Sequence, residues 1–327
     1  MVPIRKAAAV AAVATGSIGM ALAAGLPDGS TPEQQAVIAA DPPFIARPLT
    51  LVSVPAPSKR PRSLFNGWNL SGWDSWLGYQ DPSKTYAPDP GKPIGLNHDT
   101  TGVFSVVTVD GEPALFVSGK TFGGLLTKEK FRNYHLHAEF KWGEHRWTPM
   151  PRNNGILYHS SGSYGAWFGT WMQAVEFEIV PHTVGMLLTV GDSRRSRGFD
   201  NIAWNVAARV RVGHDASIVY PHRRYMPDGK LISIEFPAYN ADAAVDAEKP
   251  PGEWNSLDLY TFGDRSVHVV NGVPVLAAQD LKYTADDGRT RPLTSGRIQL
   301  QSEGAETYFR HLTIEPIDHL PVIDVSR

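Results

Sequence analysis

Short runs of alternating apolar and polar residues follow one another along most of the chain. In the run 134–142, YHLHAEFKW, apolar residues alternate with His, Glu and Lys. Successive side chains of a strand point to opposite faces, so this period of two predicts a strand with one buried face. Similar runs, bounded by Gly, Asp, Asn or Pro, lie at 103–111, 114–119, 155–161, 174–180, 186–191, 232–236, 256–263, 266–277, 296–304 and 307–317. Many short strands without a long amphipathic helix predict an all-β protein, either a β-sandwich or a jelly roll.

Two pairs of runs are separated by turn dipeptides, Asp110-Gly111 and Asn271-Gly272. Both dipeptides accept the positive φ angles of tight hairpin turns, so each predicts a β-hairpin. The polar and irregular segment 192–251 differs from its surroundings, and we expect long loops there, at one edge of the sandwich. Long loops of this kind are either functional or simple solvated insertions.

The N-terminal region is expected to lie outside the folded domain. Residues 1–24 combine Arg5 and Lys6 with an Ala/Val-rich stretch and a small-residue cleavage pattern, which is typical of a secretory signal peptide. An uncleaved membrane anchor is the alternative, but this stretch is only weakly apolar. Residues 25–62 form a Pro/Ala-rich leader or linker, and 63–327 form the jelly-roll domain. We therefore expect a periplasmic or secreted protein without stable membrane insertion after cleavage.

Charge and composition exclude several function classes. Lys and Arg (31) nearly balance Asp and Glu (33) without a long basic run, which argues against a nucleic-acid partner. The absence of cysteine removes disulfides, thiol nucleophiles and thiolate metal sites. No P-loop, dinucleotide-binding glycine motif or serine-hydrolase elbow is present, so no nucleotide or organic cofactor is expected.

The run 172–182, MQAVEFEIVPH, places Glu176 and Glu178 on the same face of a predicted strand, opposite Val175, Phe177 and Ile179. One interpretation is a solvated face on which both glutamates only increase solubility. The other is the floor of a cleft where paired carboxylates perform acid/base chemistry, because neighbouring carboxylates shift each other's pKa.

Histidines offer further candidates. His135 and His137 share a strand face with Glu139 and Lys141, and such a face suits a divalent metal ion. Solvated histidines beside an ordinary Glu139–Lys141 ion pair are the simpler alternative. His159, at the end of another strand, can titrate near neutral pH and suits a general base or a metal ligand, although a lone histidine at a strand end is more often a surface residue.

Seven short motifs, in order from about Ser63 to Ile317, resemble those of the 3-keto-disaccharide hydrolase family, which has a concanavalin A-like jelly-roll fold. They are SLFNGWNLSGW, FGGLLTKEKFRNYHLHAEFKW, NNGILYH, VEFEIV, PPGEWNSLDLY, VVNGVPV and GRIQLQSEGAETYFRHLTIEPI. The resemblance implies cleavage of an oxidised carbohydrate, a 3-keto-glycoside or 3-keto-disaccharide, by hydrolysis or by elimination and hydration. Glu178 stands where this family commonly has Gln.

The resemblance and the strand pattern together select the candidate site residues. The catalytic candidates are His159, Glu176 and Glu178. The substrate-binding candidates are Glu139, Lys141, Asn153, Trp167, Trp171, Asn271, Gln301 and Glu303. A divalent metal ion is a candidate cofactor, with His135 and His137 as its ligands. Because the same fold serves lectins, a non-catalytic carbohydrate-binding module is the alternative function.

Overall fold

The computed structural model describes residues 49–57, 59–149, 151–194, 201–212, 218–235 and 238–325. These residues form two large antiparallel sheets that pack face to face around one core. In the described part of the chain the one helical segment is the 3₁₀ turn η1 (Pro82–Lys84). The expected all-β, jelly-roll sandwich is confirmed. No helix among the described residues is long and apolar enough to cross a membrane.

The smaller sheet contains the strands that carry the glutamates. Its order is β15 (Asn240–Ala241), β11 (Leu187–Val190), β10 (Gln173–Ile179), β9 (Asn154–Ser161), β20 (Arg297–Ser302), β7 (Gly123–Thr127), β3 (Trp73–Leu77) and β4 (Gly95–Leu96). One face of this sheet packs on the core, and the other face points away from the larger sheet.

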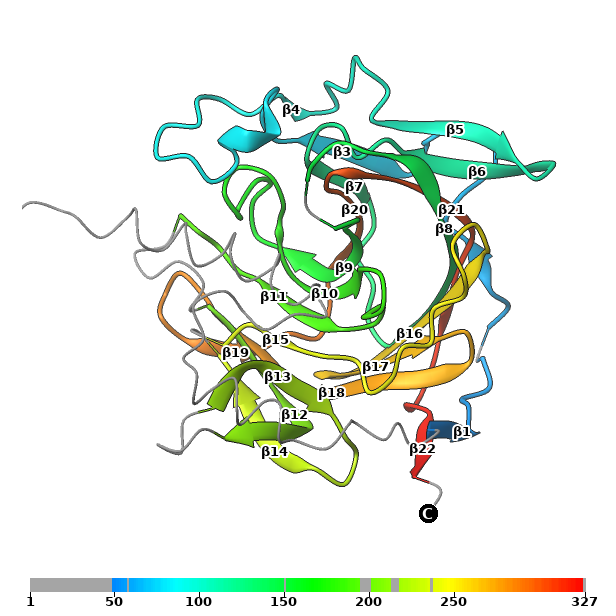
Figure 1. Ribbon diagram of the computed structural model, residues 1–327, viewed down its shortest axis with the longest axis vertical. Helices are drawn as coiled ribbons and strands as arrows, with labels where there is room; N and C mark the ends of the chain where they lie inside the picture. Colours follow the sequence, from blue (N-terminus) through cyan, green and yellow to red (C-terminus); the bar gives the residue numbers. More distant parts are fainter. Residues whose placement is uncertain are drawn as a thin grey trace, which may run out of the picture.

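The larger sheet covers the opposite side of the core. Its order is β13 (Ile218–Tyr225), β12 (Ile202–Val212), β18 (Val273–Thr284), β17 (Arg265–Val270), β16 (Asn255–Phe262), β8 (Tyr134–Arg146), β21 (Ala305–Pro316), β6 (Glu112–Val117) and β5 (Phe104–Val109). Short strands join it at three points, namely β14 (Lys230–Ile234) on β12, β19 (Thr290–Pro292) on β18 and β2 (Arg62–Ser63) on β21. The β5–β6 hairpin and the β12–β14 strands lie at opposite ends of the molecule (Figure 1).

Both predicted hairpins are present. Asp110 and Gly111 have φ angles of 52° and 83° between β5 and β6, and Asn271 and Gly272 have 51° and 78° between β17 and β18. Two successive positive φ angles match the twist of paired strands, and glycine adopts them without a steric penalty.

The predicted long loops at 192–251 are largely wrong, because this segment contains β12, β13, β14 and β15. The missed signal is an alternation in β12, where Ile202, Trp204, Val206 and Ala208 are buried. Polar segments before and after β12 obscured this alternation in the sequence.

The predicted linker at 25–62 also contains structure. Its last part forms β1 (Leu49–Ser53), paired with β22 (Val322–Val325), and begins β2 at Arg62. Leu49 is buried in the main core, so this part of the chain belongs to the domain. The predicted signal peptide, residues 1–24, and the linker up to residue 48 lie outside the described residues.

Candidate active site

Strand β10 turns its two glutamates away from the core. Val175, Phe177 and Ile179 pack between the sheets, as the alternation predicts. Glu176 and Glu178 lie on the opposite face but are only 1% and 2% exposed. The interpretation of a solvated, solubilising face is therefore wrong, because segments above the sheet cover both carboxylates.

A third carboxylate, Glu303, joins them from the end of β20. The backbone of Glu303 pairs with that of Asn153, which directly precedes β9. Asn153 Nδ2 donates a hydrogen bond to Glu303 Oε2 over 3.1 Å. Strands β10, β9 and β20 are neighbours in the sheet, so residues separated by more than a hundred positions meet at one place. We call Glu176, Glu178 and Glu303 the glutamate triad.

Burial and mutual repulsion disfavour the charged forms of the triad. The pKa of Glu176 lies well above its usual range because of burial, followed by the charges of Glu178 and Glu303. Burial and the charge of Glu303 raise the pKa of Glu178, against a smaller effect of a hydrogen bond with Asn153. Burial raises the pKa of Glu303 to about 8. At neutral pH the triad therefore holds at least one proton that it can give to a ligand.

Three buried acceptor atoms near the triad have no hydrogen-bond partner among the described residues. They are Glu176 Oε1, Asn153 Oδ1 and Gln301 Oε1. Their side chains are at most 6% exposed. A buried polar atom without a partner costs free energy, so such atoms are uncommon unless a ligand or water satisfies them. Three of them together indicate a site for a ligand with several donors.

A glycine lets Glu176 lie close against the sheet. Gly155 on β9 pairs with Glu178 on β10, and a Cβ atom at Gly155 would collide with Glu176 Oε1. Any larger residue at this position would push the carboxylate outward. The backbone of β9 thus positions Glu176 directly.

Aromatic side chains pack on the same face of the sheet. Trp171 stacks on Phe122, with ring centroids 5.9 Å apart, and its indole donates to Gly123 O. Trp171 is only 2% exposed, which makes it part of a small apolar cluster. Trp167 and Tyr86 pack against this cluster and remain partly exposed. Of the two predicted tryptophans, Trp167 is thus the one accessible to a ligand.

Tyr86 was not among the predicted residues. It follows η1 in a polar stretch, DPSKTYAPDP, that has no strand pattern. Its pKa is raised by burial and then by the charge of Glu303, with smaller effects of Glu176 and Glu178. A hydrogen bond with Trp167 acts in the opposite direction. A loop far from β10 in sequence thus supplies a neutral phenol near the triad.

His159 lies on the other side of the sheet. A strict period of two would place it with Leu157 on the triad face, but the β9–β10 register shifts at this point and His159 has a φ angle of 53°. Its ring packs against Tyr134 and Tyr158 between the sheets. Burial lowers its pKa to about 4, with the backbone of Leu293 acting in the opposite direction. The structure therefore separates His159 from the carboxylates with which the motif predicts it to act.

The candidates on β8 also lie away from the triad, on the outer face of the larger sheet. Glu139 accepts a 2.6 Å hydrogen bond from Arg310 Nε, and Lys141 Nζ lies 3.0 Å from Asp110. The predicted Glu139–Lys141 ion pair is replaced by these two pairs. Neither residue approaches the triad face in this structure.

The histidines predicted to bind a metal ion are held by carboxylates instead. His135 lies 2.8 Å from both Glu315 and Asp258, and His137 lies 2.8 Å from Asp258. We call these four residues the histidine network. Since both ring nitrogens of His135 face carboxylate oxygens, no lone pair of this ring is free for a metal ion. The structure thus offers an ion-pair network where the sequence suggested a metal site.

Asn271 has a structural position at the tip of the β17–β18 hairpin. Its side chain donates to Ala247 O and to Asn255 Oδ1, and it accepts from the backbone of Ser256. These bonds hold the hairpin to the loop before β16. Asn271 thus lies on the larger sheet and not among the triad strands, and its contact with a substrate stays a prediction.

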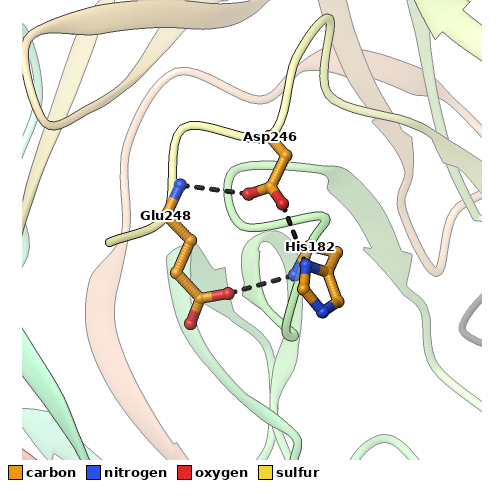
Figure 2. A group of neighbouring side chains, drawn as sticks. All are labelled: His182, Asp246 and Glu248. Atoms are coloured by element: carbon orange, nitrogen blue, oxygen red, sulfur yellow. Dashed lines mark hydrogen bonds and ion pairs between the residues drawn. The ribbon is translucent and has the colours of Figure 1, made fainter. Parts of the chain in front are cut away.

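Among the described residues, one group of three side chains could hold a metal ion: His182, Asp246 and Glu248. His182 Nδ1 lies 2.9 Å from Asp246, and the His182 backbone N–H donates to Glu248 (Figure 2). The remaining carboxylate oxygens accept from Trp142 Nε1 and from the Glu248 backbone. Every carboxylate oxygen of this group therefore already has a partner. The group joins two loops and is only a weak candidate for a metal site.

Comparison with known proteins identifies the family. The 3-keto-alpha-glucoside-1,2-lyase-like domain matches residues 60–315, and the chain belongs to this family. It thus carries a carbohydrate-active, lyase-like domain. No curated protein is similar enough to the chain to count as a relative.

Several solved structures are similar to the chain. A candidate glycosyl hydrolase from Parabacteroides distasonis is 17% identical, with 88% of this chain and 98% of that chain covered and a TM-score of 0.41. The alginate lyase AlyC3 is 14% identical, with 76% and 91% covered and a TM-score of 0.36. The carbohydrate-binding module CBM66 from Bacillus subtilis is 9% identical, with 65% and 91% covered and a TM-score of 0.36.

Proposed function

We propose that this protein cleaves 3-keto-glycosides by eliminating the substituent at C1, with hydration of the product completing a net hydrolysis. The observation that carries this proposal is the glutamate triad, in which three buried carboxylates lie beside acceptor atoms without partners. Such an arrangement costs stability, and acid/base chemistry on a ligand rich in hydroxyl groups explains why it is present.

The proposed reaction begins with the loss of the C2 proton. The ketone at C3 makes this proton acidic, and an ionised glutamate accepts it while its electrons form an enolate. The enolate then re-forms the ketone, a C1–C2 double bond appears, and the C1–O bond breaks. A protonated glutamate supplies a proton to the departing oxygen, so that each bond broken is balanced by a bond formed. Addition of water across the new double bond gives the free 3-keto sugar.

Different environments favour different roles within the triad. Glu303 has a pKa raised to about 8 by burial alone, so it is the first of the three to ionise and is our candidate for the base. Glu176 has an oxygen without a partner, held against Gly155, and the charges of Glu178 and Glu303 raise its pKa further, so it keeps its proton longest and is our candidate for the acid. Glu178 lies between them, because the charge of Glu303 raises its pKa and its own charge raises the pKa of Glu176.

A divalent metal ion remains a proposed cofactor. The histidine network does not fit one, because carboxylates occupy both ring nitrogens of His135. The group of His182, Asp246 and Glu248 has suitable donor types, but its oxygens already have partners. We therefore assign no reaction step to a metal ion, and the assay below includes a chelator.

A carbohydrate-binding module without catalysis is the second candidate, supported by the partly exposed Trp167 beside the triad. Sugar rings stack on such aromatic faces, and binding alone would not require a general base. In that case Trp167→Ala would abolish binding and no product would form.

The test is to incubate the purified protein with 3-keto-trehalose and with a 3-keto-glucoside, each with and without chelator, and to follow the products by mass spectrometry. We expect free 3-keto-glucose or its dehydrated form, and loss of this product in Glu176→Gln. Intact substrates with retained glycan binding would instead establish the binding module. Loss of activity with chelator would identify a metal requirement.

We also propose that the protein is exported, on the basis of the signal-peptide pattern in residues 1–24. The mass of the mature protein recovered from its native cell fraction tests this proposal. Full-length protein in the cytosol would contradict it.

A further inference from the structure

The proposed elimination passes through an enolate, whose negative oxygen needs hydrogen-bond donors. The buried atoms without partners near the triad are Glu176 Oε1, Asn153 Oδ1 and Gln301 Oε1, and all three are acceptors. Burial, neighbouring carboxylates and a hydrogen bond with Asn153 set the pKa values of the triad, and no Lys or Arg of the described residues contributes. An oxyanion is stabilised by donors placed where its charge develops, so a donor beside the triad would complete the proposed machinery.

Tyr86 lies above the face of the sheet that carries the triad. It packs against the small apolar cluster that contains Trp171 and Ala174. Ala174 lies two residues before Glu176 on β10, so both side chains point to the same face of the sheet. The Tyr86 ring also meets the ring of Phe168 edge to face, with centroids 5.0 Å apart and an interplanar angle of 69°. These contacts hold the phenol on the triad face.

The backbone around Tyr86 is fixed by two short turns. The Thr85 backbone N–H donates to Pro82 O over 3.0 Å, and the Ala87 backbone N–H donates to Lys84 O over 2.9 Å. Thr85 is only 1% exposed, so this part of the chain is anchored in the protein. A group held in this way keeps its position during a reaction, which a catalytic donor requires.

A hydrogen bond with Trp167 leaves the phenol proton available. An indole N–H can only donate, so Tyr86 Oη accepts from Trp167 and keeps its own proton as a donor. A bond donated to the phenol oxygen also strengthens the O–H as a donor. Among the triad, Glu303 raises the pKa of Tyr86 more than Glu176 or Glu178 does. Since Glu303 is the candidate base for C2, and C3 is bonded to C2, the phenol is placed to serve the C3 oxygen.

We propose that Tyr86 is a further catalytic residue, whose phenol O–H hydrogen-bonds to the C3 oxygen of the keto sugar and stabilises the enolate. This inference rests on the proposed function. Glu303 removes the C2 proton, the C2–H electrons form a C2–C3 double bond, and the carbonyl electrons move to the C3 oxygen, to which Tyr86 donates. When the ketone re-forms, a C1–C2 double bond appears and the C1–O bond breaks with a proton from Glu176. Tyr86 keeps its proton throughout.

The experiment separates enolate formation from cleavage. The 3-keto form of 1,5-anhydroglucitol carries a hydrogen at C1 in place of a leaving group, so it can form the enolate but cannot be cleaved. Deuterium uptake at C2 in D₂O is followed by NMR, beside the kcat for cleavage of a 3-keto-glucoside. We expect Tyr86→Phe to slow both by about a hundredfold, the usual cost of one oxyanion donor. Glu176→Gln should lose cleavage and keep the exchange, because the acid acts only at C1.

Tyr79→Phe is the matched control. Tyr79 is 6% exposed in the same segment of the chain, and burial raises its pKa without an effect of the triad. This variant should exchange and cleave as wild type does. NMR titration with methyl glucoside, which has no ketone, tests whether Tyr86→Phe still binds sugar as wild type does, and we expect that it does.

The outcomes distinguish this inference from the proposed function. A wild type that neither exchanges nor cleaves would overturn both. An active wild type with full exchange in Tyr86→Phe would overturn the role of Tyr86 alone, and would leave a protonated Glu178 as the alternative donor. Loss of methyl glucoside binding in Tyr86→Phe would also overturn it, because Tyr86 would then shape the site and not act on the enolate.

Discussion

The glutamate triad and the histidine network come from similar sequence patterns but differ in their partners. Both lie on strands that alternate apolar and charged residues, EFEI in β10 and HLHAEFK in β8. In the histidine network each acid faces a base at 2.8 Å. In the triad, acids face acids, and Glu176 Oε1 has no partner among the described residues.

This difference distinguishes a structural cluster from a functional one. Paired charges satisfy one another and need no ligand. Charges of one sign, buried together, are unfavourable in the free protein and become useful only when a ligand takes or gives protons. The comparison therefore predicts that equivalent substitutions will affect activity on one sheet and stability on the other.

The largest expected effect is on turnover. Glu176→Gln should lower kcat by about a thousandfold, because removal of a general acid typically costs a hundredfold to ten-thousandfold. Its stability should not fall, since the change replaces a buried carboxyl group whose Oε1 atom has no hydrogen-bond partner among the described residues. Glu315→Gln should do the opposite, with unchanged turnover and a loss of about 1 kcal/mol. Product formation and chemical denaturation check both variants, and equal activity in the two would remove the distinction.

The second prediction concerns the pH dependence of stability, which should have opposite signs for Asp258 and Glu303. Burial disfavours ionisation of Asp258, but hydrogen bonds from His135 and His137 outweigh it and lower its pKa to about 2. Its contribution is thus present above about pH 4 and is lost as pH falls through 2. Glu303, with a pKa raised to about 8, favours folding below about pH 4, and this contribution is lost as pH rises through 8.

Two variants test these signs. Asp258→Asn should lower stability by about 2 kcal/mol at pH 7 and by much less near pH 2, because it breaks a partly buried ion pair. Glu303→Gln should raise stability at pH 8 relative to wild type and change it little at pH 4. Urea denaturation at several pH values measures both. A shift of the same sign for both variants at pH 8 would contradict the comparison.

The smallest effect concerns the geometry of the triad. Gly155→Ala places a methyl group where Glu176 Oε1 lies, so the carboxylate must move. We expect kcat to fall about tenfold, since small displacements of a catalytic group reduce its efficiency. Steady-state kinetics measure the change, and Ala174→Gly on β10 serves as a small-residue control. Unchanged kcat in Gly155→Ala would show that the position of Glu176 is not critical.

The sequence by itself determined the strands and their faces. A period of two in β8 and β10 correctly separated buried from outward side chains, because an extended chain alternates them regardless of its surroundings. Asp-Gly and Asn-Gly located both hairpins for an equally local reason, the positive φ angles of their turns. The strand pattern also placed Glu176 and Glu178 on one face, and seven motifs indicated the family that residues 60–315 confirm.

The tertiary structure decided which of these side chains meet and which are paired. A register shift turned His159 into the core, and strands adjacent to β8 supplied the acids that occupy His135 and His137. Tyr86 reached the triad through a loop without any periodic signal. Burial and charge pairing depend on segments distant in sequence, so local patterns cannot show them. For this reason the sequence indicated the triad strand, while the fold revealed that its charges are buried and unpaired.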